Sequence, residues 1–287
     1  MSNLFEPRRF WCFFKKTILE KPGQLIGFTG FILLITFVFY SIFHLPAERW
    51  DGTQRISLFG GLTIGVTLLA SFVFGHFSTN AGGCAYLTQP ASQFEKWLCA
   101  ILITGILFPL IFLGFFRIMD MSFVNYYHSL LDPSKPNYKQ LYEYAHVFTF
   151  DNIISRNIYM LAGNFSGIML VGALYFNKNA FIKTALVFCA VILLLFGLNY
   201  IIARLFFGTL EDTFPFMNVN ISMAKNSSQG GQIFHAITSK SNGLFIKEIG
   251  MVELPTNAKN FFGTVVRYVL PPFWYLLAYI RLREKEF

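Results

Sequence analysis

Long apolar segments without charged residues alternate with short polar segments along most of the chain. A helix needs about 20 apolar residues to cross the hydrocarbon core of a bilayer. Six segments meet this requirement, so the pattern predicts six transmembrane helices. Their approximate ranges are 25–44, 56–76, 97–116, 153–175, 181–207 and 261–280.

The sixth segment is the least regular, because Arg267 lies within it and Pro271 and Pro272 interrupt it. An arginine near the end of a span can extend its side chain to the head groups. Proline is tolerated in a membrane helix where neighbouring groups satisfy the freed backbone carbonyls. We therefore count this segment as a span.

The regions outside the spans differ in character. In residues 1–21, basic residues alternate with aromatic and aliphatic ones, which predicts an amphipathic helix on the membrane surface. Two longer polar regions, 121–151 and 211–259, are expected on the outer side. The short apolar stretches of the second leave open whether it contains a small α/β structure. Residues 1–287 are interpreted as a single polytopic membrane domain.

Composition supports the membrane interpretation and excludes a soluble protein. The 287 residues are 54% hydrophobic and only 13% charged, whereas soluble domains carry about 25% charged residues. The predicted fold class is an all-α integral membrane protein, with six transmembrane helices and an N-terminal amphipathic interfacial helix. The net charge of +8 favours anionic lipid head groups, since no basic stripe typical of nucleic-acid binding is present.

With six spans, the basic N-terminal segment, the Lys178 turn and the basic C-terminal tail lie on one side of the membrane. The positive-inside rule makes that side cytoplasmic. Both termini are therefore expected in the cytoplasm.

Motifs that carry chemistry are missing from the sequence. It has no GxxxxGK[ST] nucleotide loop, no HExxH zinc motif, no GxSxG elbow and no CxxC pair among its four cysteines. We expect no catalytic residues, no metal ligands and no cofactor, and the chain is not predicted to be an enzyme. A chain without a nucleotide loop would need a separate subunit to use ATP.

Polar residues gather at the outer ends of two spans. Arg117 and Asp120 follow the third span, and Asp151 and Arg156 begin the fourth. One interpretation is interfacial anchoring and ion pairing that hold the two helices together. The other is a polar gate at the outer mouth of a pathway, lined further in by residues such as Asn164. An Asn within a span more often makes an interhelical hydrogen bond.

Glycine pairs in two spans have the small-xxx-small spacing that allows helices to approach closely. They are Gly61 with Gly65 and Gly163 with Gly167. The pattern indicates close helix packing and is compatible with dimerisation.

Residues 86–97, YLTQPASQFEKW, carry a more specific pattern. They resemble the LPAS-x-x-EK segment of permease subunits in the type-two class of ABC exporters, especially membrane proteins of the Bacteroidetes, although Gln89 stands where that family usually has Leu. The order of an amphipathic helix, six spans and a long outer segment before the last span is also similar. The resemblance implies a bacterial inner-membrane location and a separate cytoplasmic ATPase subunit that docks on this segment. The ATPase-coupling residues it implies are Pro90, Ala91, Ser92, Glu95 and Lys96, with Glu95 and Lys96 exposed to the partner.

A local interpretation of the same residues needs no partner. Ser92 as N-cap and Glu95 at the third helical position form a capping box at the start of a helix. Both interpretations can hold together.

Two hypotheses for the function remain. The first is a permease-like subunit of an ABC-type export system that forms a homo- or heterodimer and is driven by the separate ATPase. The second is a non-transporting membrane scaffold, or anchor, of an envelope complex.

Overall fold

The computed structural model describes residues 5–20, 22–43, 50–150, 153–176, 178–207, 218–225, 235–236, 246–253 and 255–285. The contacts divide the chain into two compact units, whereas the sequence suggests one membrane domain. The first unit contains residues 1–184 and 266–287, and the second contains residues 185–265.

Six helices or continuous helical runs are long and apolar enough to cross a membrane. This confirms the predicted fold class, a multi-pass membrane protein whose spans are all α-helical. The six are α2 (Pro22–Phe43); α3 (Trp50–Val73); the run α5 (Gln93–Ile101), η3 (Leu102–Leu107) and α6 (Phe108–Leu130); α8 (Ile153–Tyr175); α9 (Ala180–Phe207); and the run α10 (Thr256–Thr264), η4 (Val265–Val269) and α11 (Leu270–Glu284).

The two largest extensions beyond the spans predicted from hydropathy are those of α3 and α6. Helix α3 begins at Trp50, inside the predicted first loop, and α6 continues to Leu130, inside the predicted outer loop. Hydropathy marks where the surroundings become polar, but a polar environment does not end a helix. The extensions pack on each other and on the following loop, where Trp50, Val124 and Ala145 are buried together.

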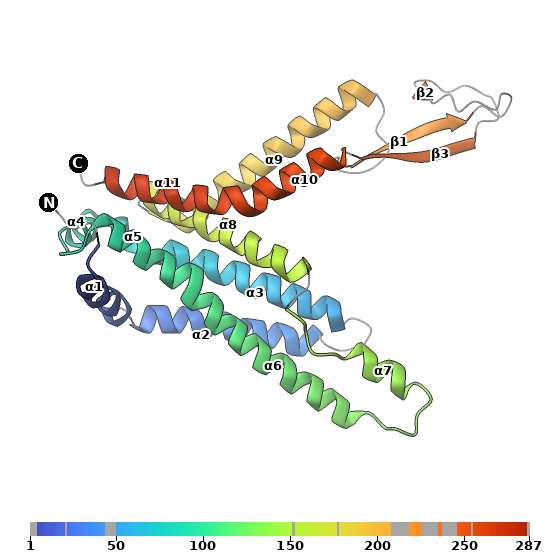
Figure 1. Ribbon diagram of the computed structural model, residues 1–287, viewed down its shortest axis with the longest axis horizontal. Helices are drawn as coiled ribbons and strands as arrows, with labels where there is room; N and C mark the ends of the chain where they lie inside the picture. Colours follow the sequence, from blue (N-terminus) through green and yellow to red (C-terminus); the bar gives the residue numbers. More distant parts are fainter. Residues whose placement is uncertain are drawn as a thin grey trace. The chain divides into compact units, whose positions relative to one another are not determined.

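Helix α3 lies at the centre of the first unit. It packs against α2, α6 and α8, and α8 packs in turn against α11. The amphipathic helix α1 (Pro7–Glu20) and the short helix α4 (Asn80–Leu87) lie at one end of this bundle, and α7 (Tyr138–Tyr144) lies at the opposite end (Figure 1). The N-terminal helix and the end of α11 share the first of these ends, as an even number of spans requires.

Close packing around α3 depends on two of its glycines. A Cβ atom at Gly61 would lie 2.5 Å from the Phe112 ring and from Thr36 Oγ1, and one at Gly65 would overlap the Phe108 ring. The close helix contact predicted for the Gly61-xxx-Gly65 spacing is therefore present, between α3, α2 and α6.

Gly61→Ala is expected to lower the free energy of unfolding by about 1–3 kcal/mol, because the added methyl group overpacks a well-filled contact. Gly60→Ala is the matched control, since nothing lies within 4 Å of a Cβ atom at that position. Denaturation of both variants in mixed micelles measures the difference. If the Gly61→Ala and Gly60→Ala variants were equally stable, the contact at Gly61 would have room for an added methyl group.

The second unit contains a small antiparallel sheet, which answers the question that the sequence leaves open for residues 211–259. Its strands are β1 (Asn218–Lys225), β2 (His235–Ala236) and β3 (Ile246–Glu253), in the order β2-β1-β3. β1 and β3 pair along their full length, from Asn218 opposite Glu253 to Lys225 opposite Ile246.

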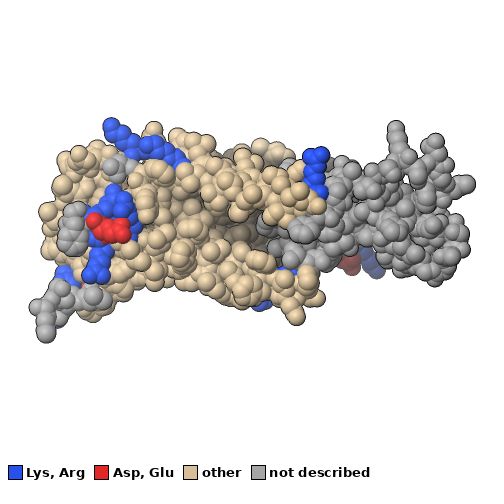
Figure 2. Space-filling view, turned by 90° about the horizontal axis from the view of Figure 1, so that it is seen from above, with Lys and Arg blue, Asp and Glu red and all other residues tan. Residues whose placement is uncertain are grey.

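Charged side chains are unevenly distributed on the surface. On the face shown in Figure 2, most Lys and Arg side chains lie toward one end of the described residues, a few lie toward the other, and a broad surface of uncharged residues lies between them. Such a charge-poor surface suits contact with lipid hydrocarbon.

Candidate functional site

The segment that resembles the exporter motif forms a tight turn between two helices. Helix α4 ends at Leu87, and α5 begins at Gln93. Ser92 Oγ accepts a hydrogen bond from the Glu95 amide at 3.2 Å, and Glu95 Oε2 accepts one from the Ser92 amide at 2.8 Å. The predicted capping box is confirmed.

The Glu95 carboxylate also joins α5 to the amphipathic helix α1. It accepts hydrogen bonds from Arg9 Nε at 2.8 Å, from Arg9 Nη2 at 2.9 Å and from the Glu6 amide at 2.9 Å. The Glu95 side chain is fully buried, while that of Arg9 is 30% exposed. The hydrogen bond to Glu95 raises the pKa of Arg9, so the guanidinium of this α1–α5 ion pair stays charged. A bidentate pair of this kind fixes the orientation of the two helices as well as their contact.

Lys96 is also held within the chain. Its ammonium group donates to the Leu87 carbonyl at 2.9 Å and lies 5.6 Å from the centre of the Tyr86 ring. The side chain is almost fully buried, and it satisfies a carbonyl at the end of α4.

The expectation that Glu95 and Lys96 are exposed to a partner is therefore wrong. Both side chains turn back from the first turn of α5, where α1 and α4 supply their partners. Pro90 is exposed, and Ala91 and Ser92 are half-buried. Of the five residues implied by the resemblance, these three remain accessible.

Further contacts fix this end of the bundle to the spans. Trp97 Nε1 donates to the Tyr275 carbonyl of α11 at 2.8 Å. At the end of α11, the Arg281 guanidinium lies 4.4 Å from the centre of the Tyr175 ring of α8. We call residues 88–92 the α4–α5 turn. The helices next to it are held together by these contacts, which involve α1, α5, α8 and α11.

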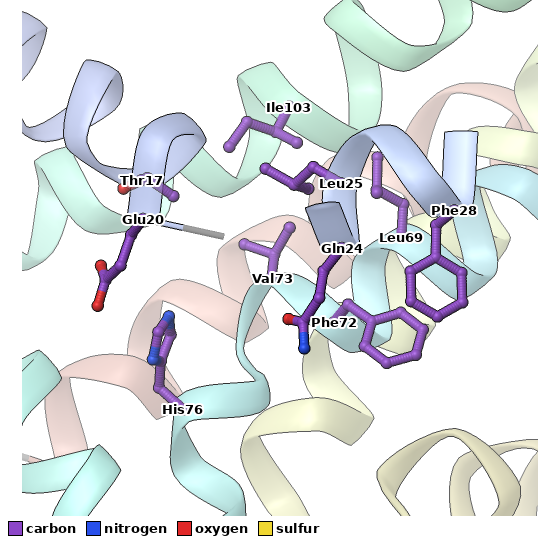
Figure 3. A pocket seen from close by; sticks show the side chains of 10 residues that line it. All are labelled: Thr17, Glu20, Gln24, Leu25, Phe28, Leu69, Phe72, Val73, His76 and Ile103. Atoms are coloured by element: carbon purple, nitrogen blue, oxygen red, sulfur yellow. The ribbon is translucent and has the colours of Figure 1, made fainter. Parts of the chain in front are cut away.

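A small pocket lies between α1, α2 and α3 near the same end (Figure 3). Its lining includes the polar side chains of Glu20, Gln24 and His76 and apolar residues such as Phe72 and Val73. Its volume of about 40 Å³ is room for roughly three water molecules, since one needs about 10–15 Å³ by this measure. The pocket is too small for a substrate.

A buried carboxylate organises the opposite end of the bundle. Asp120 is fully buried. It accepts hydrogen bonds from the Tyr40 hydroxyl at 2.6 Å, from Gln54 Nε2 at 2.8 Å and from the Phe148 amide at 2.8 Å. Gln54 Nε2 also donates to the His146 carbonyl. One side chain thus connects α2, α3, α6 and the loop before α8.

The predicted outer polar cluster is only partly assembled. Arg117 donates to the Phe148 carbonyl at 2.8 Å, and no ion pair joins it to Asp120 in the described part of the chain. Arg156 is exposed, and Asp151 lies outside the described residues. The ion pairing expected between the third and fourth spans is therefore wrong for Asp120, because neutral hydrogen-bond donors surround this carboxylate.

Asn164 makes the interhelical hydrogen bond that is usual for Asn in a span. Its Nδ2 donates to the Val266 carbonyl of η4 at 3.0 Å. In a π-helical segment this carbonyl would accept a hydrogen bond from the backbone amide five residues further along the chain. That position is Pro271, which has no amide hydrogen. Asn164 thus supplies a donor in place of the amide that Pro271 lacks.

Sequence reasoning missed Arg9, Tyr40 and Gln54 as members of these two networks. The sequence gave no reason to single out Arg9, because it is one of several basic residues in α1. Tyr40 and Gln54 could have been suspected, because each is a polar residue near the end of a span.

No group of three or more His, Cys, Asp or Glu side chains that could hold a metal ion occurs among the described residues. All four cysteines, Cys12, Cys84, Cys99 and Cys189, are free thiols. Comparison of the chain with models of protein families, with curated proteins and with solved structures found no match.

Proposed function

We propose that the chain is the permease-like subunit of an ABC-type export system in a bacterial inner membrane, driven by a separate cytoplasmic ATPase. The end of the bundle with α1 and the α4–α5 turn would then face the cytoplasm. The basic residues of α1 and of the C-terminal tail support this orientation.

The observation that carries the proposal is that the α4–α5 turn is exposed, while the start of α5 that follows it is held by buried contacts. Pro90 is exposed, whereas Glu95 and Lys96, only a few residues further on, are almost completely buried. A force applied to this turn would not be relieved by a local rearrangement, because the capping box and the α1–α5 ion pair hold the first turn of α5 in place. The force would pass to α5 and, through Trp97, to α11. A subunit moved by an external ATPase needs this arrangement.

Substitution in the turn is expected to remove the ATPase. Pro90→Arg together with Thr88→Arg places two bulky charges on the accessible side of the turn without touching the buried contacts. Recovery of an ATPase with the tagged chain, after gentle extraction from native membranes, should fall by on the order of tenfold, as for an interface hot spot. Quantitative mass spectrometry of the co-purified proteins measures it.

The matched control is Ser134→Arg, in the exposed loop at the opposite end of the bundle, which should leave the recovery unchanged. Exchange of Glu95 and Lys96 would be a poor test, because it disrupts contacts within the chain. Recovery of envelope proteins only, unaffected by the turn variant, would contradict the permease proposal and favour the scaffold.

A further inference from the structure

The two halves of the sixth span differ in how they are packed. In the C-terminal half, α11, the side chains of Ala278 and Leu282 are buried, and the helix packs against α8 and α5. A Cβ atom at Gly167 of α8 would lie 2.7 Å from Trp274 Cβ, so these two helices are in close contact. In the N-terminal half, no residue of α10 or η4 is buried. Neighbouring helices therefore hold α11 in place, whereas the described part of the chain does not hold α10 in the same way.

The backbone hydrogen bonding is interrupted between the two halves. The π-helical segment η4 is followed by Pro271 and Pro272 at the start of α11. Neither proline has an amide hydrogen, so two backbone carbonyls in the preceding turn lose their helical donors. Sharp bends in long helices occur mainly at prolines and at π-helical segments. The chain also passes from one compact unit to the other within η4, between Val265 and Val266.

One side chain of a neighbouring helix contacts η4 at this interruption. Asn164 of α8 is 7% exposed. Its Nδ2 donates to the Val266 carbonyl of η4 and to the Met160 carbonyl of its own helix, each at 3.0 Å. If the contact with Val266 were broken, Asn164 Nδ2 would keep its Met160 partner. The contact can therefore open without leaving a buried amide group unpaired, which is the costly case for a hydrogen bond.

We propose that η4 is a hinge at which α10 changes its angle to α11, and that the hydrogen bond from Asn164 to Val266 stabilises one of two hinge angles. Hinges are short segments that absorb a change in backbone angles while the elements on either side keep their structure. Here α11 is the fixed arm, because it packs on α8 and α5. The moving arm is α10, which closely follows β3 in the chain. The proposal concerns the isolated chain and does not depend on an ATPase partner.

A distance measurement between two spin labels on the same helical run tests the hinge. Nitroxides are attached through encoded azido amino acids at Phe262 and Ile280, on either side of η4, so that the four native cysteines stay in place. Both side chains are exposed. Double electron–electron resonance on the intact chain in lipid nanodiscs is expected to give two distances.

A control pair at Val187 and Leu205 is equally far apart in sequence. Both of its side chains are exposed, and both lie on α9, which is one uninterrupted helix. This pair should give one narrow distance. A single distance of the same width from both pairs would overturn the proposal.

Variants separate the parts of the hinge. Asn164→Ala should lower the population of one distance roughly fivefold, the ratio that corresponds to an ordinary hydrogen bond. Leu161→Ala, an exposed position on the same helix, is the control and should leave the populations unchanged. Pro271→Ala with Pro272→Ala restores two amide donors and should merge the two distances into one.

Equal populations in the Asn164→Ala and Leu161→Ala variants would contradict the role of Asn164. Two distances that persist after both prolines are replaced would contradict the hinge. The measurement on the unsubstituted chain decides the hinge even where Asn164→Ala fails to fold.

Discussion

Asp120→Ala is expected to destabilise the membrane bundle by about 3 kcal/mol, since it leaves several buried hydrogen-bond donors without an acceptor. The donors are the Tyr40 hydroxyl, the Gln54 amide group and the Phe148 backbone amide. They come from α2, α3 and the loop before α8, so the variant should loosen this whole end of the bundle. Unfolding in mixed micelles measures the change.

Asp51→Ala is the matched control for Asp120→Ala. Asp51 pairs with Arg55 on the same helix, and both side chains are at least 40% exposed. Loss of such an exposed pair should cost less than about 0.5 kcal/mol. Near-equal effects of the two substitutions would mean that water reaches Asp120 and replaces its partners, contrary to its burial.

Glu95→Ala is expected to release the amphipathic helix α1 from α5. The substitution removes the acceptor for Arg9 and for the Glu6 amide, and it breaks the capping box of α5 at the same time. Hydrogen exchange in residues 7–20 should quicken by at least about tenfold, because charge-assisted hydrogen bonds are among the stronger ones that anchor a segment. Exchange measured by mass spectrometry in detergent checks this.

Glu6→Ala separates the role of the ion pair from that of general charge near Arg9. It removes a neighbouring carboxylate but keeps the backbone amide that Glu95 accepts from, so exchange in α1 should stay unchanged. If both variants left α1 equally protected, packing of its apolar face on the membrane or on α5, rather than the buried carboxylate, would hold the helix.

The six spans could be predicted from sequence because hydropathy reports the solvent that a segment prefers, and charge-free runs of sufficient length have one stable environment. The ends of α3 and α6 could not be predicted in the same way. Gln54 and Asp120 are polar residues, but Gln54 Nε2 donates a hydrogen bond to Asp120 inside the bundle. A local pattern cannot show that residues so far apart in sequence will meet.

In the candidate site, too, contacts between residues close in sequence could be predicted, whereas contacts between distant residues could not. The capping box of Ser92 and Glu95 depends on residues three positions apart, and the sequence was enough to predict it. The ion pair of Glu95 with Arg9 joins positions far apart in the chain. It buries the Glu95 side chain, which the sequence led us to expect on the surface. The register of β1 with β3 could not be predicted, because the short apolar stretches of residues 211–259 fit more than one structure.

The continuous helical run from α5 through η3 to α6 is longer than a membrane is thick. Its 38 residues correspond to about 57 Å at a rise of 1.5 Å per residue, whereas a bilayer with its head groups measures about 40–45 Å. A helical run of this length that stands upright in the membrane projects into water at one end. The contact of Trp50, Val124 and Ala145 near the Leu130 end would then act as a miniature soluble core that is independent of bilayer thickness. The protein should consequently tolerate membranes of different lipid chain length without losing the order of that end.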